Sequence, residues 1–355
     1  MKRITVIGAG NGGQAYAGYC AAKGYEVCLY NRNIDKLGTL REKKEIRLTG
    51  RLNYTSSITT VTDNIKDACE FGDIVLIVTP ATAHRQLATE MGPFVRNGQS
   101  ILLNPGRTLG TVEFETELTR HTNERINIGE SQTLAFACRI IENGTINIIG
   151  VKDHVPVACS RYNNIDTIFD DIFPIFHCFE KEKSLLKVGF DNIGSIFHPA
   201  VVLFNAATIE RQDSFYFYRD MTPQIASVIE ALDNERIRIG KSYGYKLMPV
   251  CDWIKYAYPT TIGNSLCERM RNNPGYHDIK APGTIFTRQL TEDIPTGLLP
   301  MRELGKLAGI CTPIMDSIIT LVSTLLGIDF SVSGRTLKNL GLDGMSKSDI
   351  INTIG

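Results

Sequence analysis

Short apolar runs, separated by helical stretches, fill the first half of the chain. The runs are almost continuously hydrophobic and rich in β-branched residues. They cover residues 4–8, 26–30, 74–78, 100–103, 146–151 and 155–159. Continuous apolar strands are typical of a parallel sheet covered on both faces. A helix is expected over residues 14–23, and the alternation of strand and helix indicates βαβ units. The pattern predicts a doubly wound parallel sheet that continues to about residue 180.

The second half of the chain has few strand-like runs and several helical ones. Thr222 followed by Pro223 is typical of a helix start, because threonine caps the free N–H groups and proline fits the first helical position. Further helices are expected within residues 249–271 and 304–326. We therefore expect a mostly α-helical second domain over residues 186–355.

A glycine-rich segment, GAGNGG at residues 8–13, lies between the first predicted strand and the first predicted helix. It matches GxGxxG, and this context makes the motif specific for dinucleotide binding. Gly8 permits the tight turn, Gly10 lets a pyrophosphate approach the backbone, and Gly13 lets the helix pack close to the strand. The sequence thus predicts an α/β fold whose first domain, residues 1–185, is a Rossmann-type nucleotide-binding domain.

The end of the second predicted strand favours NADP, with NAD as the alternative. NAD sites usually carry an acid there for the ribose 2′-hydroxyl, but this chain has Asn31 and Arg32 and no acid before Asp35. A guanidinium would pair with a 2′-phosphate. Two further turns, at residues 79–80 and 104–106, follow the predicted strands 74–78 and 100–103. They either contact the cofactor or are ordinary strand-ending turns. The residues expected to contact the cofactor are Gly8, Gly10, Asn11, Gly12, Gly13, Asn31, Arg32, Thr79, Pro80, Asn104 and Gly106.

Composition narrows the classes of partner. The 38 basic and 38 acidic residues balance, so no global charge favours nucleic acid or an anionic membrane.

The nine cysteines are odd in number and lack CxxC spacing, which predicts reduced thiols rather than a disulfide framework or a metal site. Residues 314–328 form the longest apolar helix candidate, and they are too few to span a bilayer. The N-terminal apolar run is too short for a signal peptide. A cytoplasmic protein is expected.

A nicotinamide cofactor transfers hydride, so the protein must manage a proton. Reducing a carbonyl or an imine needs a general acid such as histidine. Among the six histidines, His198 is favoured by its context, because it opens the helical domain next to the expected domain boundary. The adjacent acids Glu292 and Asp293 either hold an imidazole or cap a helix.

These motifs together identify a family resemblance that covers almost the whole chain. The sequence resembles the opine dehydrogenases, the octopine/nopaline dehydrogenase family. The stretches that carry the resemblance are VIGAGNGGQAYA, GESQTLAFACR, FHPAVVLFNAATIE, ALDNERIRIGKSYGY, RQLTEDIPTGLLPMRELGKLAGICTP and GRTLKNLGL. Members reductively condense the amino group of an amino acid with a 2-oxo acid such as pyruvate. Their fold is a Rossmann domain followed by a helical domain, with the substrates in the cleft between them.

The resemblance also implies roles for individual residues. His198 and Asp293 match the family's catalytic pair, and Arg288 matches the arginine that holds the oxo-acid carboxylate. In the GESQTLAFACR stretch, Glu130, Thr133 and Arg139 become candidates for substrate binding. Phe136 stands where the family usually has tyrosine, so a hydroxyl contact is not expected there.

Two other functions stay open. One is an NADPH-dependent reductase of a small 2-oxo or 2-hydroxy acid, resembling ketopantoate reductase, which would use a lysine among Lys181, Lys183 and Lys187. The other is a dinucleotide-binding module without catalysis. The expected partners are small molecules, an amino acid and a 2-oxo acid. The sequence leaves the identity of that amino acid and the choice between monomer and homodimer undetermined.

Overall fold

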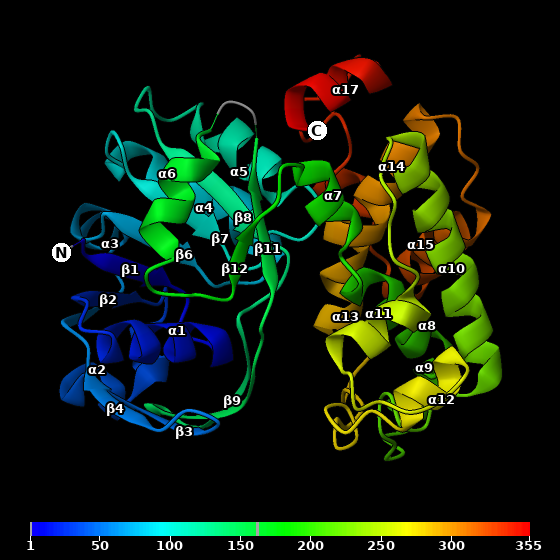
Figure 1. Cartoon of the computed structure of the whole chain (residues 1–355), viewed down its shortest axis with the longest axis horizontal. Coiled ribbons are helices and arrows are strands. Elements are labelled where there is room, and N and C mark those ends of the chain that lie inside the picture. The colour runs from blue at the N-terminus through cyan, green and yellow to red at the C-terminus, as the bar shows by residue number, and fades with distance from the viewer. Residues whose placement is uncertain (1, 161–162) are drawn as a thin grey trace. The chain divides into compact units, whose positions relative to one another are not determined.

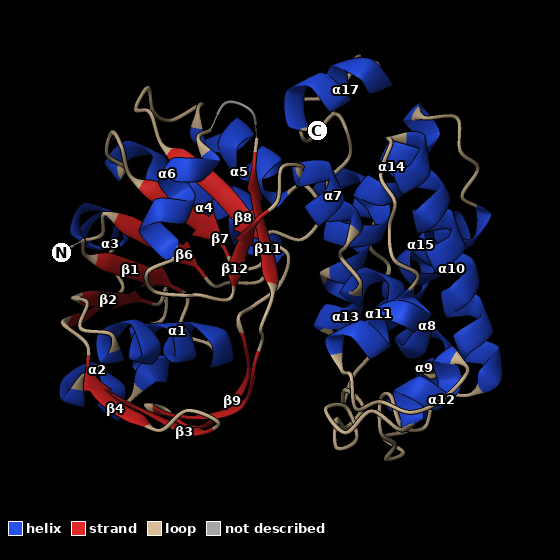
Figure 2. Cartoon of the chain, viewed as in Figure 1, coloured by secondary structure: helices blue, strands red, loops and turns tan. Residues whose placement is uncertain are grey.

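The computed structural model describes residues 2–160 and 163–355, and its chain divides into two compact units (Figure 1). The first unit comprises Met1–Val188 together with Thr353–Gly355, and the second comprises Gly189–Asn352. The expected α/β domain followed by a helical domain is confirmed (Figure 2).

Within the described residues, the main sheet of the first unit has eight strands in the order β12-β11-β8-β7-β6-β1-β2-β5. The strands are β1 (Ile4–Ile7), β2 (Val27–Tyr30), β5 (Thr60–Thr62), β6 (Ile74–Ile77), β7 (Ser100–Leu103), β8 (Asn127–Ser131), β11 (Val155–Cys159) and β12 (Phe179–Lys181). Neighbouring strands run parallel except β11, which is antiparallel to β8. The central strands β1, β2, β6 and β7 are buried along their whole length, as their continuous apolar sequences predict.

A second, four-stranded sheet differs from the prediction. Its order is β4-β3-β10-β9, with β3 (Glu45–Gly50), β4 (Tyr54–Ser57), β9 (Phe136–Glu142) and β10 (Thr145–Val151). The run at residues 146–151 was expected to continue the main sheet, and this expectation is wrong. The strand instead packs Ile146 and Ile148 against helix α1 (Asn11–Ala22), in a shared core with Ile46 and Leu48.

Helices complete the first unit. They are η1 (Ile34–Leu37), α2 (Thr39–Lys43), α3 (Ile65–Phe71), η2 (Ala81–Ala83), α4 (His84–Met91), η3 (Gly92–Phe94), α5 (Gly110–Leu118) and α6 (Ile165–Ile172). Helix α1 and its neighbours build one apolar core, and α3, α4 and α5 contribute to a second core that includes Val75, Ile77, Ile101 and Leu103. Side chains on the same strand alternate between these two cores, so both faces of the sheet are covered.

The second unit is helical. Helices α7 (Leu185–Phe190) and α17 (Lys347–Ile354) cross the division between the units. The others are α8 (Gly194–Phe204), α9 (Ala206–Glu210), α10 (Pro223–Ser242), α11 (Val250–Ala257), α12 (Leu266–Arg271), α13 (Arg288–Thr291), η4 (Ile294–Leu298), α14 (Leu299–Leu307), α15 (Pro313–Leu326) and α16 (Phe330–Ser333). The Thr222 hydroxyl accepts from the Ile225 amide and caps α10, as predicted.

Two expected helices of this unit are each interrupted. The stretch 249–271 forms α11 and α12, because Pro259 follows the first and the Ser265–Glu268 capping box begins the second. The stretch 304–326 breaks after α14, where Gly309 has φ +70° and Pro313 starts α15.

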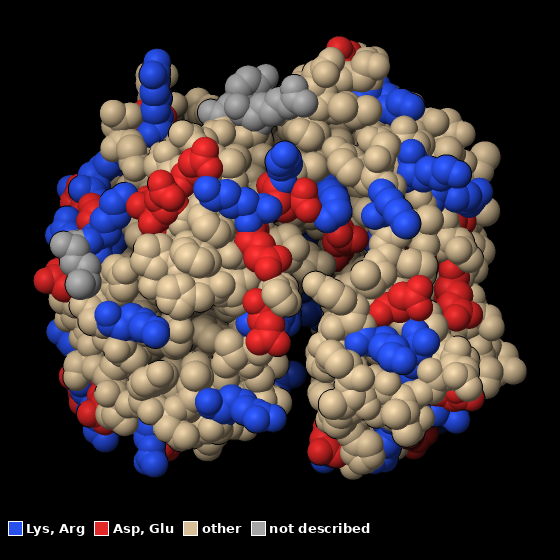
Figure 3. All heavy atoms as spheres, in the orientation of Figure 1, with Lys and Arg blue, Asp and Glu red and all other residues tan. Residues whose placement is uncertain are grey.

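All nine cysteines are free thiols. In the described part of the chain, no helix is both long and apolar enough to cross a membrane, and no group of three or more metal-ligating side chains is found. Basic and acidic side chains are interspersed on the face in Figure 3.

Candidate active site

The glycine loop between β1 and α1 has the shape that a pyrophosphate needs. Gly8 has φ +102°, and a Cβ atom there would lie 2.5 Å from the Val78 carbonyl oxygen. A Cβ on Gly13 would lie 1.7 Å from the Gly8 carbonyl oxygen, so α1 can start at this point only with glycine. Gly10, in contrast, has open space where its Cβ would be. The loop is therefore closed on the protein side and open on the other, which suits a ligand phosphate at the helix N-terminus.

The loop lies at the switch point of the sheet. Strand β1 pairs with β2 on one side and with β6 on the other, so the chain order reverses between β1 and β6. In such sheets a dinucleotide binds at the carboxyl ends of the strands at this point. Thr79 follows β6 there, and its Oγ1 atom is buried without a hydrogen-bond partner among the described residues. An orphaned hydroxyl beside an open glycine loop fits a dinucleotide as the missing partner.

Arg32 lies just beyond β2 and is exposed to solvent. It forms no ion pair with any described side chain. The neighbouring Asn31 donates from Nδ2 to the Asn33 carbonyl oxygen at 2.5 Å, and Asn33 caps the short helix η1. The strand end therefore presents a cation to the solvent, with its neighbours engaged in the local turn.

Several predicted cofactor contacts have side chains engaged within the unit. Asn11 accepts the Ile140 amide through Oδ1 at 2.8 Å, which ties the start of α1 to the second sheet. Gly12 packs closely on Val78. Asn104 is buried, donates to the Leu102 carbonyl oxygen and accepts from the Ser131 hydroxyl. The Asn11 Oδ1 atom and the Asn104 side-chain amide are therefore engaged within the first unit.

The GESQTLAFACR stretch separates its three candidates. Glu130 is fully buried and accepts the Thr111 amide at 2.6 Å, so it caps the start of α5. A Cβ on Gly106 would lie 2.4 Å from this carboxyl group, so Gly106 is needed for the carboxyl to fit. Arg139 is exposed on β9 of the second sheet. Thr133 lies just beyond β8, where its Oγ1 accepts from the Lys152 ammonium at 2.5 Å.

His198 and Asp293, predicted to act together, are in contact within the second unit. Nδ1 of His198 on α8 lies 2.7 Å from Oδ2 of Asp293, which is 95 residues later in the chain. A Cβ on Gly297 would lie 2.4 Å from the Ser195 Cβ, so this glycine lets η4 pack tightly on α8. Segment η4 is a single π-helical turn, a feature frequent at functional sites. The Asp293 carboxylate is almost fully buried, while the imidazole is partly exposed.

The other imidazole nitrogen binds a residue that sequence reasoning missed. Nε2 of His198 lies 2.8 Å from the Tyr218 hydroxyl. Because a carboxylate only accepts hydrogen bonds, we assign the Nδ1 proton to the Asp293 contact, and the tyrosine then donates to Nε2. Tyr218 stacks on Tyr276, with ring centroids 4.4 Å apart. An aromatic residue within the run FYFY is typical of a buried core position. The sequence therefore carried no signal that Tyr218 would bind His198.

Arg288 has a buried acid as its partner. Its Nε and Nη2 atoms lie 2.8 and 2.6 Å from the same oxygen, Oε2 of Glu292. The guanidinium is 65% exposed, whereas the glutamate is 3% exposed. Glu292 therefore fixes one edge of a guanidinium whose other edge faces solvent, and such an edge binds a carboxylate in two parallel hydrogen bonds.

Two of the three lysines proposed for the alternative function, Lys181 and Lys187, form ion pairs within the first unit. Lys181 binds Asp166 and Lys187 binds Glu182, each at 2.6 Å.

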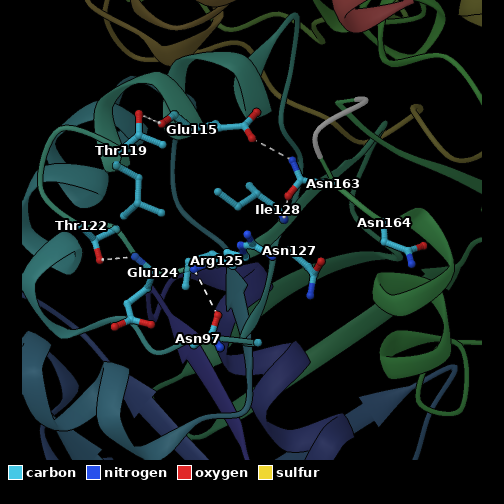
Figure 4. A pocket seen from close by; sticks show the side chains of 13 residues that line it. Asn97, Glu115, Thr119, Thr122, Glu124, Arg125, Asn127, Ile128, Asn163 and Asn164 are labelled. Atoms are coloured by element: carbon cyan, nitrogen blue, oxygen red, sulfur yellow. Dashed lines mark hydrogen bonds between the residues drawn. The ribbon is translucent and has the colours of Figure 1, made fainter.

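The first unit has a polar hollow of about 580 Å³ (Figure 4), and no residue of the glycine loop lines it. Its lining includes Asn97, which precedes β7, and Asn127, which begins β8, so it lies at the amino edge of these parallel strands. Burial raises the pKa of Glu115 in its wall, and this carboxyl group is held by Ser160 and Asn163. The loops expected to bind the cofactor lie at the opposite edge.

Comparison with known proteins places this geometry in a family. Residues 181–326 match the model of the NAD/NADP octopine/nopaline dehydrogenase alpha-helical domain. Residues 3–120 match the NAD-dependent glycerol-3-phosphate dehydrogenase N-terminus. The opine dehydrogenase of Arthrobacter sp. (strain 1C) is 32% identical over 358 residues, covering 99% of both chains.

Solved structures agree on the fold. Octopine dehydrogenase with NADH and L-arginine superposes with a TM-score of 0.82 at 18% identity, over 99% of this chain and 98% of that one. Yersinopine dehydrogenase with NADP+ gives a TM-score of 0.72 at 14% identity, over 99% and 98%. With a full-length relative above 30% identity, a nicotinamide-dinucleotide domain and a matching helical domain, the chain belongs to the opine dehydrogenase family of NAD(P)-dependent oxidoreductases.

Proposed function

We propose that this protein reductively condenses the amino group of an amino acid with a 2-oxo acid such as pyruvate, using NAD(P)H. The observation that carries the proposal is the pairing of two adjacent acids with two functional side chains, Asp293 with His198 and Glu292 with Arg288. One pair can move a proton and the other can hold a carboxylate. Both operations are needed to join an amine to an oxo acid.

Arg288 anchors the oxo acid in this proposal. Its solvent-facing edge binds the carboxylate in two parallel hydrogen bonds, which fixes the plane of the adjacent carbonyl group. Glu292 holds the guanidinium in place before substrate arrives. Holding two reactants in one geometry contributes several kcal/mol toward lowering the barrier.

His198 handles the protons. When the amine adds to the carbonyl carbon, the departing oxygen must receive a proton to leave as water, and the imidazolium Nε2–H supplies it. In the reverse direction the neutral Nε2 accepts a proton from the water that adds to the carbon–nitrogen double bond, and the amine leaves with a proton. Asp293 keeps the Nδ1 proton in place and stabilises the imidazolium. Tyr218 occupies Nε2 in the described structure, so its hydroxyl either yields to the substrate oxygen or shares the proton with it.

A bound reduced nicotinamide supplies the hydride that reduces the carbon–nitrogen double bond. Residues of the glycine loop, with Thr79 beyond β6, would hold the dinucleotide. We propose NADP rather than NAD as the preferred cofactor. An exposed guanidinium at Arg32 and the absence of an acid between Tyr30 and Asp35 support this choice. Nine free thiols support a cytoplasmic site of action.

The test is the oxidation of NADPH by pyruvate, with and without a pool of the twenty amino acids. Oxidation that requires the pool supports the proposal, and dividing the pool names the amine. Oxidation with pyruvate alone would indicate an ordinary oxo-acid reductase instead.

A further inference from the structure

One lysine of the first unit is partly buried and has no acidic partner. Lys152 lies between β10 and β11, and its Nζ atom donates to Thr133 Oγ1 at 2.5 Å. Its backbone amide bonds the Ala135 carbonyl oxygen, which fixes the start of the side chain. No carboxylate pairs with this ammonium among the described residues.

The surroundings of Lys152 disfavour its charge. Burial, together with the positive charge of Arg107, lowers the pKa of Lys152 to about 8. The acidic group that acts on it is the Cys178 thiol, and burial raises the pKa of that thiol to about 11. This thiol is therefore neutral near pH 7 and gives Lys152 no counter-charge. The negative charges of Asp153 and Glu180 also raise the pKa of Cys178. A desolvated ammonium without an anion is costly, unless a ligand provides the anion.

The position of Lys152 in the sheet indicates which ligand. Thr133 follows β8 and Arg107 follows β7, so both lie at the carboxyl edge of these parallel strands. Strand β11 is antiparallel to β8, so Lys152, which precedes it, lies at the same edge. The glycine loop is at β1, two strands away from β7. This places Lys152 beyond the region that a pyrophosphate needs, on the β8 side of the sheet.

We propose that Lys152 and Thr133 form a subsite for a substrate carboxylate on the first unit. The inference rests on the proposed function, in which both the oxo acid and the amino acid carry a carboxylate. The ammonium and the threonine hydroxyl each donate one hydrogen bond to the carboxylate oxygens, and Arg107 adds to the positive potential. In the proposed mechanism Arg288 binds the carboxylate of one substrate. Lys152 is a second cation that can bind the carboxylate of the other substrate.

The test compares Lys152→Met and Lys152→Arg with the parent chain, and Lys66→Met on α3 serves as an exposed-lysine control. We expect Lys152→Met to raise the KM of one substrate about tenfold or more, because a charge-assisted hydrogen bond is lost. Lys152→Arg should keep most of the affinity. A rise confined to pyruvate assigns the oxo-acid carboxylate, and a rise confined to the amino acid assigns that one. Unchanged KM values for both would overturn the subsite.

A pH series and a binding measurement separate this proposal from the proposed function. A lowered pKa means that Lys152 is charged below about pH 8 and neutral above it, so carboxylate affinity should fall above that pH in the parent and stay flat in Lys152→Arg. Calorimetric titration of pyruvate and of the amino acid pool into the NADPH-loaded chain gives a readout without turnover. Binding that depends on Lys152 without amine-dependent oxidation would support the subsite and reject the condensation. Binding unaffected by Lys152→Met, or no binding at all, would overturn the subsite.

Discussion

Glu292 and Asp293 are consecutive in the chain, yet their buried carboxylates bind different side chains. Glu292 faces back along α13 and holds Arg288 one turn earlier, whereas Asp293 faces α8 and holds His198. Neighbouring residues on a helix point about 100° apart, so one short segment can position two groups. We propose that this segment sets the distance between the carboxylate anchor and the acid–base group.

Glu292→Gln tests the anchor. The amide loses the charged contact that fixes the Arg288 guanidinium, and we expect the KM for pyruvate to rise about tenfold with little change in NADPH affinity. Solvent screens the freed charge of the exposed guanidinium, so the lost orientation should dominate. Glu303→Gln on α14 makes the same chemical change beside Arg302 and should leave KM unaltered. A lower KM in Glu292→Gln would contradict a positioning role.

His198→Ala tests the proton transfer. We expect turnover to fall about 10²–10⁴-fold, while NADPH binding measured by fluorescence stays nearly constant. His121→Ala, three residues beyond α5, is the control for loss of a histidine. If both variants turn over at the parental rate, His198 takes no part in the chemistry.

Tyr218→Phe asks whether the hydroxyl at Nε2 matters. Loss of one hydrogen bond of about 1 kcal/mol should change kcat about fivefold and shift the acid limb of its pH profile. Tyr276→Phe is the control, because it keeps the stacked ring and removes a hydroxyl that interacts with Tyr258. Identical pH profiles in parent and Tyr218→Phe would show that the contact is only structural.

Arg32→Ala tests the cofactor preference. Loss of a guanidinium that pairs with a 2′-phosphate should raise the KM for NADPH about tenfold or more and hardly alter that for NADH. Arg41→Ala on the neighbouring helix α2 controls for the lost surface charge. An unchanged NADPH/NADH ratio would argue for NAD as the cofactor.

Two glycines of the loop, Gly13 and Gly10, offer a matched pair of variants. In Gly13→Ala the new Cβ would meet the Gly8 carbonyl oxygen, so we expect the free energy of unfolding to fall by about 1–3 kcal/mol or more. Gly10→Ala has space for its methyl group and should keep its stability while binding NADPH more weakly. Chemical denaturation and cofactor titration of both variants check this. Equal stability losses in the two would contradict the described packing.

Much of the main sheet follows from the sequence because its strands are uniformly apolar. The predicted bounds of β7 and β11 match the observed ones. The second sheet was missed because β3 alternates buried Ile46 and Leu48 with exposed Glu45 and Arg47, unlike the continuous apolar runs of the main sheet. One of its two partners, β10, also lies about a hundred residues later. Sequence patterns report local periodicity, and they do not report which distant strands pair.

At the candidate active site, too, sequence patterns did not report which distant segments are in contact. His198 was favoured by its context, but its contact with Asp293 joins segments 95 residues apart, and only the family resemblance singled out that acid. Tyr218 and Lys152 had no signal at all, since an aromatic residue in an apolar run and a lysine in a turn are ordinary. Their partners become visible only when the tertiary fold brings them together.

The central claim is that an amine and an oxo acid are joined. The most direct measurement is mass spectrometry of the product formed from NADPH, carbon-13-labelled pyruvate and the amino acid pool. We predict a labelled secondary amine with the mass of one amino acid plus pyruvate, less one water and plus two hydrogens. Labelled lactate as the sole reduced product would contradict the claim.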